Sequence, residues 1–167
     1  GRVALAVNDG QFVYFERGQK SCLAGPFCAA PMISSFPTLA DPERIAGVLQ
    51  GNLPLLPDPD SETLTFSRRE GLYVLTQSAG ETVQEVRITP DGLRVTQGLL
   101  KRSGKVILKV DFGGRLRVGN RTMPQQVRLR APDADLDLLV EFREAEHGYQ
   151  FKGDPFVFDC PSGVDVQ

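Results

Sequence analysis

The stretch Val106-Ile107-Leu108-Lys109-Val110-Asp111-Phe112 decides the fold class of this chain. Its residues 106, 108, 110 and 112 are all apolar, and in an extended strand they lie on one side. This two-residue period is typical of a β-strand that buries one face. Ser103-Gly104 precedes the stretch and Gly113-Gly114 follows it, and both dipeptides favour turns. The stretch therefore predicts a strand between two turns.

The same alternation recurs along most of the chain. Residues 126–130 and 135–142 each turn apolar side chains one way and most polar ones the other. Many short strands separated by turns are typical of a meandering antiparallel sheet, and we expect it to curl into a barrel or sandwich. The turn signals are Asn8-Asp9-Gly10, Glu70-Gly71, Ala79-Gly80, Pro90-Asp91-Gly92, Gly119-Asn120 and Ala131-Pro132-Asp133.

Helical signals interrupt this pattern within residues 25–51. Asp41-Pro42-Glu43 supplies an N-cap, a proline at the first helical position and an acidic first turn, and Gly51 ends the segment. We therefore predict a mainly β fold with a small helical insert, in the α+β class. Helices at about 29–36 and 41–50 would cover a curled antiparallel sheet or unclosed β-barrel.

The composition is that of an ordinary globular protein. The chain has 167 residues, of which 41% are hydrophobic and 24% charged, and its formal net charge is -2. This length suits a single domain over 1–167. No apolar run reaches the ~20 residues that cross a bilayer. The net charge and the lack of Trp do not favour nucleic-acid binding, so we predict no nucleic-acid partner.

Charge is unevenly distributed in the C-terminal half. Residues 94–130 carry ten Lys or Arg and one acid, whereas residues 131–167 carry nine acids and two Lys or Arg. Basic strands beside acidic ones would make complementary cross-strand pairs. Alternatively, the two groups form a surface with two poles that orients a charged partner.

No phosphate-binding or calcium-binding motif meets its own requirements. From Gly98 to Gly104-Lys105 the spacing is one residue too long for a phosphate-binding loop, and Val106 replaces its Ser or Thr. The aspartates of 133–137 imitate a calcium loop, but Leu138 occupies the position of the obligatory glycine. We predict no metal and no cofactor.

His147 is the single histidine, with Glu144 and Glu146 close to it in the sequence. A catalytic triad also requires a nucleophile, and the chain has no Gly-x-Ser-x-Gly elbow. We therefore interpret His147 as a turn residue and predict that the protein is not an enzyme.

Three stretches resemble proteins of lipoprotein sorting. Residues 156–166, Phe-Val-Phe-Asp-Cys-Pro-Ser-Gly-Val-Asp-Val, are similar to the end of LolA-type carriers, where a Phe-x-Phe strand leads into Pro-x-Gly-x-Asp-Val. Residues 123–129, Met-Pro-Gln-Gln-Val-Arg-Leu, resemble a strand upstream of that end. The run from Asn8 through Gly25-Pro26 to Asp41-Pro42-Glu43 is similar to the middle of LolB-like outer-membrane lipoproteins.

This resemblance implies an unclosed barrel with helices over its mouth and an apolar cavity that holds lipoprotein acyl chains or lipid, without a cofactor. It implies a periplasmic protein or an outer-membrane-anchored lipoprotein whose lipid anchor lies outside this chain. Family members have a helix and several strands ahead of the part that matches Arg2–Val7, so we expect a LolA-like domain that lacks them. The function implied is lipoprotein sorting or delivery to the outer membrane.

Burying each methylene of an acyl chain is worth about 0.8 kcal/mol, so such a cavity needs a long apolar lining. We predict this lining from the apolar positions of the helical segments and of the alternating strands. The predicted residues are Met32, Ile33, Phe36, Ile45, Val48, Leu49, Phe66, Leu72, Val74, Val86, Ile88, Leu93, Val95, Leu108, Val110, Val127, Leu129, Leu138 and Val140.

The chain has three cysteines, too few for a disulfide scaffold. In an exported protein we expect Cys160 to form a disulfide with Cys22 or Cys28. Closing so long a loop would contribute up to about 4–5 kcal/mol in the chain-entropy model.

Two other functions stay open. The same fold can serve as a structural or protein-interaction module of an envelope assembly, with an ordinary core and no lipid ligand. The third possibility is a hydrolase that uses His147 and a nearby acid.

Overall fold

The computed structural model describes residues 3–8, 11–16, 21–26, 42–146, 148, 150 and 165–166. The chain divides into two compact units, of which the first comprises Gly1–Pro42 and Gly148–Gln167 and the second Glu43–His147. We expected one domain over 1–167. Each unit is described here by itself.

The smaller unit contains a four-stranded sheet in the order β1-β2-β3-β13. Its strands are β1 (Val3–Asn8), β2 (Gln11–Glu16), β3 (Ser21–Pro26) and β13 (Asp165–Val166). The first three are antiparallel, whereas β13 runs parallel to β3 and pairs Val166 with Cys22.

Cys22 is buried and disulfide-bonded. Its partner is Cys28 or Cys160, the two other cysteines of the chain, and both lie outside the described residues. The pairing of Cys160 with Cys22 or Cys28 therefore stays a prediction.

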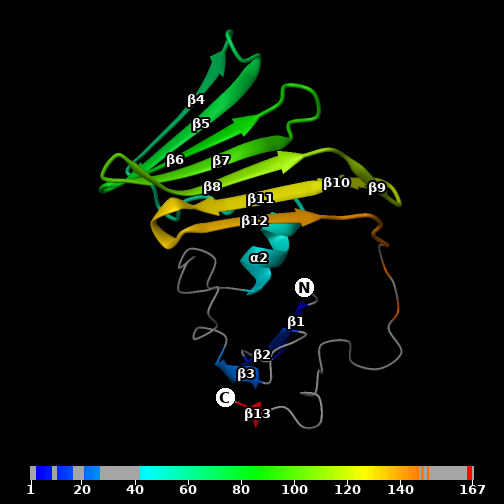
Figure 1. Cartoon of the computed structure of the whole chain (residues 1–167). Coiled ribbons are helices and arrows are strands. Elements are labelled where there is room, and N and C mark those ends of the chain that lie inside the picture. The colour runs from blue at the N-terminus through cyan, green and yellow to red at the C-terminus, as the bar shows by residue number, and fades with distance from the viewer. Residues whose placement is uncertain are drawn as a thin grey trace. The chain divides into compact units, whose positions relative to one another are not determined.

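The larger unit is built on one seven-stranded antiparallel sheet in the order β12-β11-β8-β7-β6-β5-β4. The sheet does not close, because β12 and β4 form two separate edges (Figure 1). The prediction of a mainly β, antiparallel, unclosed sheet is confirmed. The strands are β4 (Ser61–Ser67), β5 (Leu72–Ala79), β6 (Thr82–Ile88), β7 (Val95–Arg102), β8 (Lys105–Gly113), β11 (Gln126–Ala131) and β12 (Leu136–Glu141).

Short elements complete this unit. A hairpin of β9 (Leu116–Val118) and β10 (Arg121–Met123) follows β8, and the 3-10 turn η3 (Pro132–Ala134) joins β11 to β12. The helix α2 (Pro42–Leu49) precedes the sheet. The helix expected at 29–36 lies outside the described residues. None of the helices in the described part is long and apolar enough to span a membrane.

The register of the sheet sorts its side chains onto two faces. Val86 pairs with Gly98, Gly98 with Val110, and Val110 with Leu129, so these residues share one face. We call this the covered face, because residues 50–57 lie on it. Its apolar side chains supply most of the core of the larger unit. The buried members are Val86, Leu100, Leu108, Val110, Val127, Leu129 and Ala131.

The helix α2 ends in a glycine-dependent cap. Asn52 N–H donates to Gly47 C=O at 2.8 Å and Gly51 N–H donates to Val48 C=O at 3.0 Å, the two bonds of a Schellman motif. Gly51 has φ +93, and a Cβ there would lie 2.9 Å from Pro124 Cδ. Both the backbone conformation and the close approach of Pro124 therefore require glycine. Val48 of α2 is fully buried.

Candidate functional site

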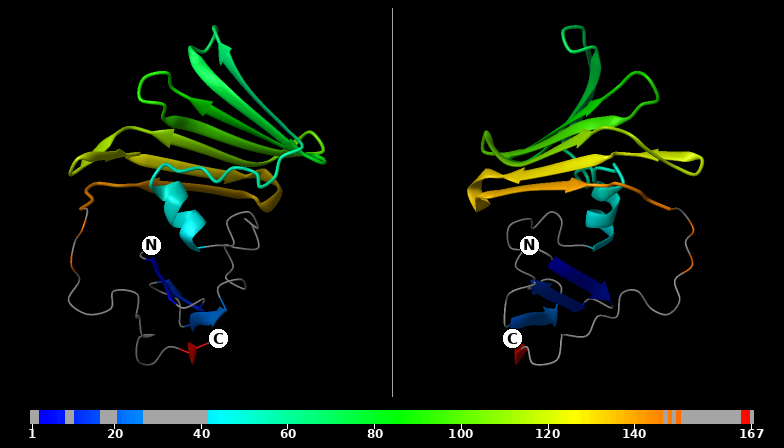
Figure 2. Two further views of the ribbon diagram at one scale, coloured as in Figure 1. Left: turned by 180° about the vertical axis from the view of Figure 1, so that it is seen from behind. Right: turned by 45° about the vertical axis from the view of Figure 1, so that its right-hand side comes forward.

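An extended segment crosses the covered face from α2 to β4. This segment, residues 50–57, is called the strap (Figure 2). It contains Pro54 and Pro57, which have no amide N–H and therefore leave fewer backbone donors to satisfy when the chain is buried. Leu53 supplies apolar contact with the sheet, whereas Leu55 is 48% exposed, so the strap is a half-buried segment without regular structure.

Two buried glutamines attach the strap to the sheet. Gln77 of β5 and Gln84 of β6 are cross-strand partners on the covered face and are only 3% and 6% exposed. Leu56 N–H donates to Gln77 Oε1 at 3.1 Å and to Gln84 Oε1 at 2.9 Å. Gln84 Nε2 donates to Pro54 C=O at 2.8 Å. The side chains thus satisfy strap peptide groups that would otherwise lose hydrogen bonds on burial.

Leu53 of the strap occupies the space above a glycine of β7. A Cβ on Gly98 would lie 2.3 Å from Leu53 Cδ2, far inside van der Waals contact. Glycine in the interior of a strand often marks a close approach of another group. Gly98, which we tested as part of a phosphate-binding loop, is instead the position against which Leu53 packs.

Beside the strap the covered face is not filled by side chains. A hollow of about 500 Å³ remains between the strap and the sheet, within the range of small-molecule sites. Its apolar wall comes from strap, sheet and β10 residues: Leu53, Leu55, Leu75, Val86, Ile88, Leu93, Val95, Phe112, Met123 and Pro124. Its polar and backbone part consists of Gln50, Gly51, Asn52, Thr89, Arg94, Thr96, Gly114, Arg115 and Thr122.

A bulge shapes one wall of the hollow. Arg87 pairs with Gln97, but the next residue, Ile88, pairs with Val95, so β7 has one extra residue at Thr96. Thr96 Oγ1 donates to Arg87 C=O at 3.2 Å. A bulge bends its strand and re-aims the side chains near it. Consecutive residues Val95 and Thr96 can both line the hollow for this reason.

The structure brings together only part of the predicted lining. Val86, Ile88, Leu93 and Val95 line the hollow. Five others are buried without lining it: Val48, Leu108, Val110, Val127 and Leu129. Ile45, Leu49 and Val140 are half-buried and also lie outside its lining. Met32, Ile33 and Phe36 lie outside the described residues.

Four predicted lining residues need correction. Tyr73 and Leu75 share a face with Ile88 and Val86, so the intervening positions Leu72 and Val74 lie on the opposite face. In β5 every residue from 72 to 75 is apolar, so alternation fits either face. A shift of one residue in such a strand moves its side chains to the other face. Phe66 and Leu138 lie on edge strands, where they are 50% and 38% exposed and do not line the hollow.

The sequence reading missed the polar and close-contact residues of this site. Gln77 and Gln84 each lie two residues from an apolar residue on the same face of their strand. A polar side chain at such a position indicates a buried hydrogen bond. Gly98 interrupts a strand pattern and was a signal for a close approach. Arg94 and Arg115 carried no local signal.

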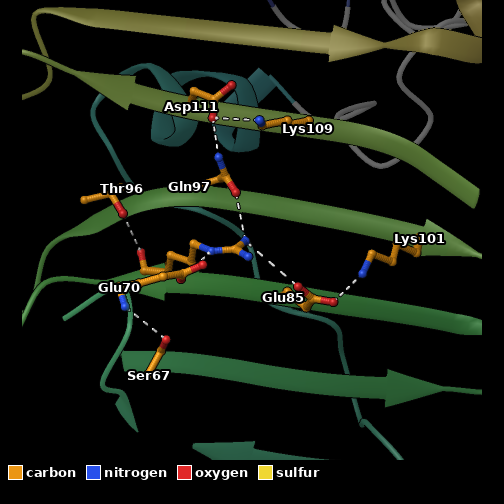
Figure 3. A network of polar contacts seen from close by, with 9 residues as sticks. Ser67, Glu70, Glu85, Thr96, Gln97, Lys101, Lys109 and Asp111 are labelled. Carbon is orange, nitrogen blue, oxygen red and sulfur yellow. Dashed lines mark hydrogen bonds and ion pairs between the residues drawn. The ribbon is translucent and has the colours of Figure 1, made fainter. Parts of the chain in front are cut away.

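The opposite face carries a ladder of polar contacts (Figure 3). Arg87 donates to Glu70 Oε2 at 3.2 Å and to Gln97 Oε1 at 2.8 Å, and Gln97 Nε2 donates to Asp111 Oδ1 at 2.6 Å. The ladder continues to Arg130 and, on the next strand pair, to Arg128 with Asp137. Of these ion pairs, only Arg128 with Asp137 joins the basic region 94–130 to the acidic region 131–167. The two interpretations of the charge pattern therefore both stay predictions.

Contacts within this ladder lower the pKa of two carboxyl groups, those of Asp111 and Asp137. Burial by itself raises the pKa of Asp111, but hydrogen bonds from Arg130 and Gln97 and the charge of Lys109 outweigh it, so the pKa lies below the ordinary value. The hydrogen bond from Arg128 likewise lowers the pKa of Asp137. Both groups therefore favour the charged form at neutral pH, as structural ion pairs do.

Asp111→Asn should make the larger unit less sensitive to acid. A carboxyl whose pKa is lower in the folded chain stabilises the fold above its unfolded pKa of about 3.9, and this contribution is lost as the pH falls through the folded pKa. The variant should lose about 1–2 kcal/mol at pH 7 and then lose less than wild type below about pH 4. Urea denaturation at several pH values measures this, with the exposed Asp133→Asn as control. Parallel pH profiles for wild type and Asp111→Asn would contradict the assignment.

No three His, Cys, Asp or Glu side chains among the described residues are grouped as metal ligands. His147 lies outside the described residues, so its predicted place in a turn is a prediction still. Comparison with protein families, with characterised proteins and with solved structures finds no match to this chain. The function is therefore inferred from the site.

Proposed function

We propose that this protein binds an acyl chain in the hollow between the strap and the sheet, and that it acts as a carrier rather than an enzyme. The observation that carries the proposal is the hollow itself. The hollow is a cleft of about 500 Å³ that opens to solvent, and leucine, valine, isoleucine and phenylalanine side chains form its apolar wall. An acyl chain is the ligand chemistry that such a wall favours, because each buried methylene contributes about 0.8 kcal/mol.

Two further features support a role in the cell envelope. The disulfide of Cys22 is the kind of bond that persists in oxidising compartments, which supports the periplasm as the location. The unclosed antiparallel sheet with a covering segment agrees with the resemblance to LolA-type and LolB-like proteins. On this basis we propose that the acyl chains belong to lipoproteins or lipids that are sorted or delivered to the outer membrane.

Filling the hollow should weaken binding without unfolding the protein. Ile88 lies on the apolar wall, and Ile88→Phe adds volume that would displace roughly two methylenes, so affinity should fall about tenfold. The control is Leu99→Phe, which enlarges a half-buried side chain on the opposite face of β7, where Leu99 pairs with Glu85 and Lys109. Displacement of a fluorescent acyl probe by a triacylated lipopeptide measures both. Equal affinities for Ile88→Phe and wild type would show that the acyl chain does not bind in this hollow.

A second function is favoured by the edge strand β4. Leu64 and Phe66 are 61% and 50% exposed, and an exposed apolar edge is a surface on which another chain can add a strand. An interaction module of an envelope assembly would use this edge. Association with an envelope protein that persists at high salt, together with no acyl binding, would favour it over the carrier.

A further inference from the structure

We propose that the hollow recognises a single-chain amphiphile with an anionic head, and that Arg94 and Arg115 bind its carboxylate or phosphate. This inference rests on the proposed acyl binding and names the class of ligand. Its basis is the charge of the lining: among the described residues, the only ionisable side chains that line the hollow are these two arginines, and no described acid lines it. Apolar wall and positive charge together match a hydrocarbon chain that ends in an anion.

The turn between β6 and β7 positions Arg94. Thr89 N–H donates to Arg94 C=O at 2.8 Å, and Arg94 N–H donates to Thr89 Oγ1 at 3.3 Å. Leu93, just before it, has φ +46 and is 71% exposed, so the chain bends sharply at the rim of the hollow. The backbone of Arg94 is thus fixed, while its side chain extends from that rim.

The present partner of Arg94 is a weak competitor for a ligand. Arg94 Nη2 lies 3.3 Å from Asp91 Oδ2, and the Asp91 side chain is 86% exposed. An ion pair this exposed contributes little, because water screens it. A carboxylate or phosphate held beside an apolar wall is less screened, so the guanidinium can exchange Asp91 for the ligand.

Arg115 is the second cation of the lining, and it follows the end of β8, which lies beside the start of β7 just after Arg94. It is exposed, and no hydrogen bond or ion pair of its side chain exists among the described residues. The hairpin that follows adds Arg117 and Arg121 and contains no acid, so the local potential is positive. On the ladder of the opposite face, by contrast, Arg87, Arg128 and Arg130 each pair with an acid.

Isothermal titration of the whole chain with four decyl ligands tests this inference. The ligands are decanoate, decyl phosphate, 1-decanol and decyltrimethylammonium, and acetate and inorganic phosphate represent the head alone. The test variant is Arg94→Gln with Arg115→Gln. The matched control is Arg117→Gln with Arg121→Gln, which removes two charges from the adjacent hairpin but none from the lining.

We expect decanoate and decyl phosphate to bind about tenfold or more tightly than decanol and the cationic ligand. The test variant should lose this preference, and the control should change it less than about twofold at 0.15 M salt. Raising the salt should weaken the two anionic ligands and leave decanol unchanged.

Other outcomes overturn the inference and separate it from the proposed function. Equal affinity for decanol and decanoate, or equal losses in the test and control variants, would refute recognition of the head while chain binding remained. Acetate or phosphate binding as tightly as the decyl anions would mean a plain anion site. Binding of none of the decyl ligands would refute the carrier function as well.

Discussion

Leu100→Ala should destabilise the larger unit by about 2–5 kcal/mol, the largest effect expected for a single side chain here. Leu100 lies on the covered face, opposite Gln84 on one neighbouring strand and Leu108 on the other, and is 6% exposed. Truncation removes apolar contacts and leaves a void that close-packed neighbours cannot fully close. Urea denaturation followed by far-UV circular dichroism measures the loss.

The adjacent Leu99 provides the control, because it lies on the opposite face of the same strand and is only half-buried. Leu99→Ala should cost about 1 kcal/mol or less, as partly exposed positions usually do. Similar losses at Leu99 and Leu100 would mean that the register does not assign the two faces as described.

Gly98→Val should cost about 2–3 kcal/mol and also reduce acyl binding. Its new Cβ would overlap Leu53 Cδ2, so Leu53 must leave its place and the strap must shift. Gly98 has Val86 and Val110 as strand neighbours, and a valine would otherwise suit this strand position. The cost is therefore assigned to the strap and not to the sheet.

A double-mutant cycle separates these two causes. Leu53→Ala removes the atoms that the new side chain would meet, so Gly98→Val should be far less harmful in that background, with a coupling of about 1–2 kcal/mol. If the two losses of stability were additive, Gly98 would be required for the strand itself, and its contact with Leu53 would not explain the cost.

The sequence predicted the strands well where alternation was clean. Residues 106–112 lie within β8, 126–130 within β11, and most of 135–142 forms β12. Within β8, however, a bulge at Ile107 pairs Val106 with Lys101, so Val106 does not share the face of Leu108, Val110 and Phe112 as expected. Alternation failed at Leu72 and Val74, because a strand with apolar residues at consecutive positions does not show which set faces inward. Leu93, which we expected on a strand, lines the hollow from a turn, where its φ is +46.

The candidate site was less predictable than the fold, because long-range contacts create it. Val95 and Thr96 both line the hollow only because of the bulge against Ile88. Arg94 and Arg115 belong to different turns and come to one lining only when β6, β7 and β8 are paired. Local sequence patterns indicate burial and turns, but they do not indicate which residues far apart in the sequence come into contact.

The attachment of the strap has a consequence for how ligand binding responds to solution conditions. Leu56 N–H, Pro54 C=O and the side-chain amides of Gln77 and Gln84 are all uncharged groups. One charged group does reach this attachment, because Gln77 Nε2 also donates to Glu62 Oε2. Ionic strength acts mainly on charges, so its effect on the strap should be confined to this contact. Any further salt dependence of acyl binding would then originate in the ligand head and its arginines.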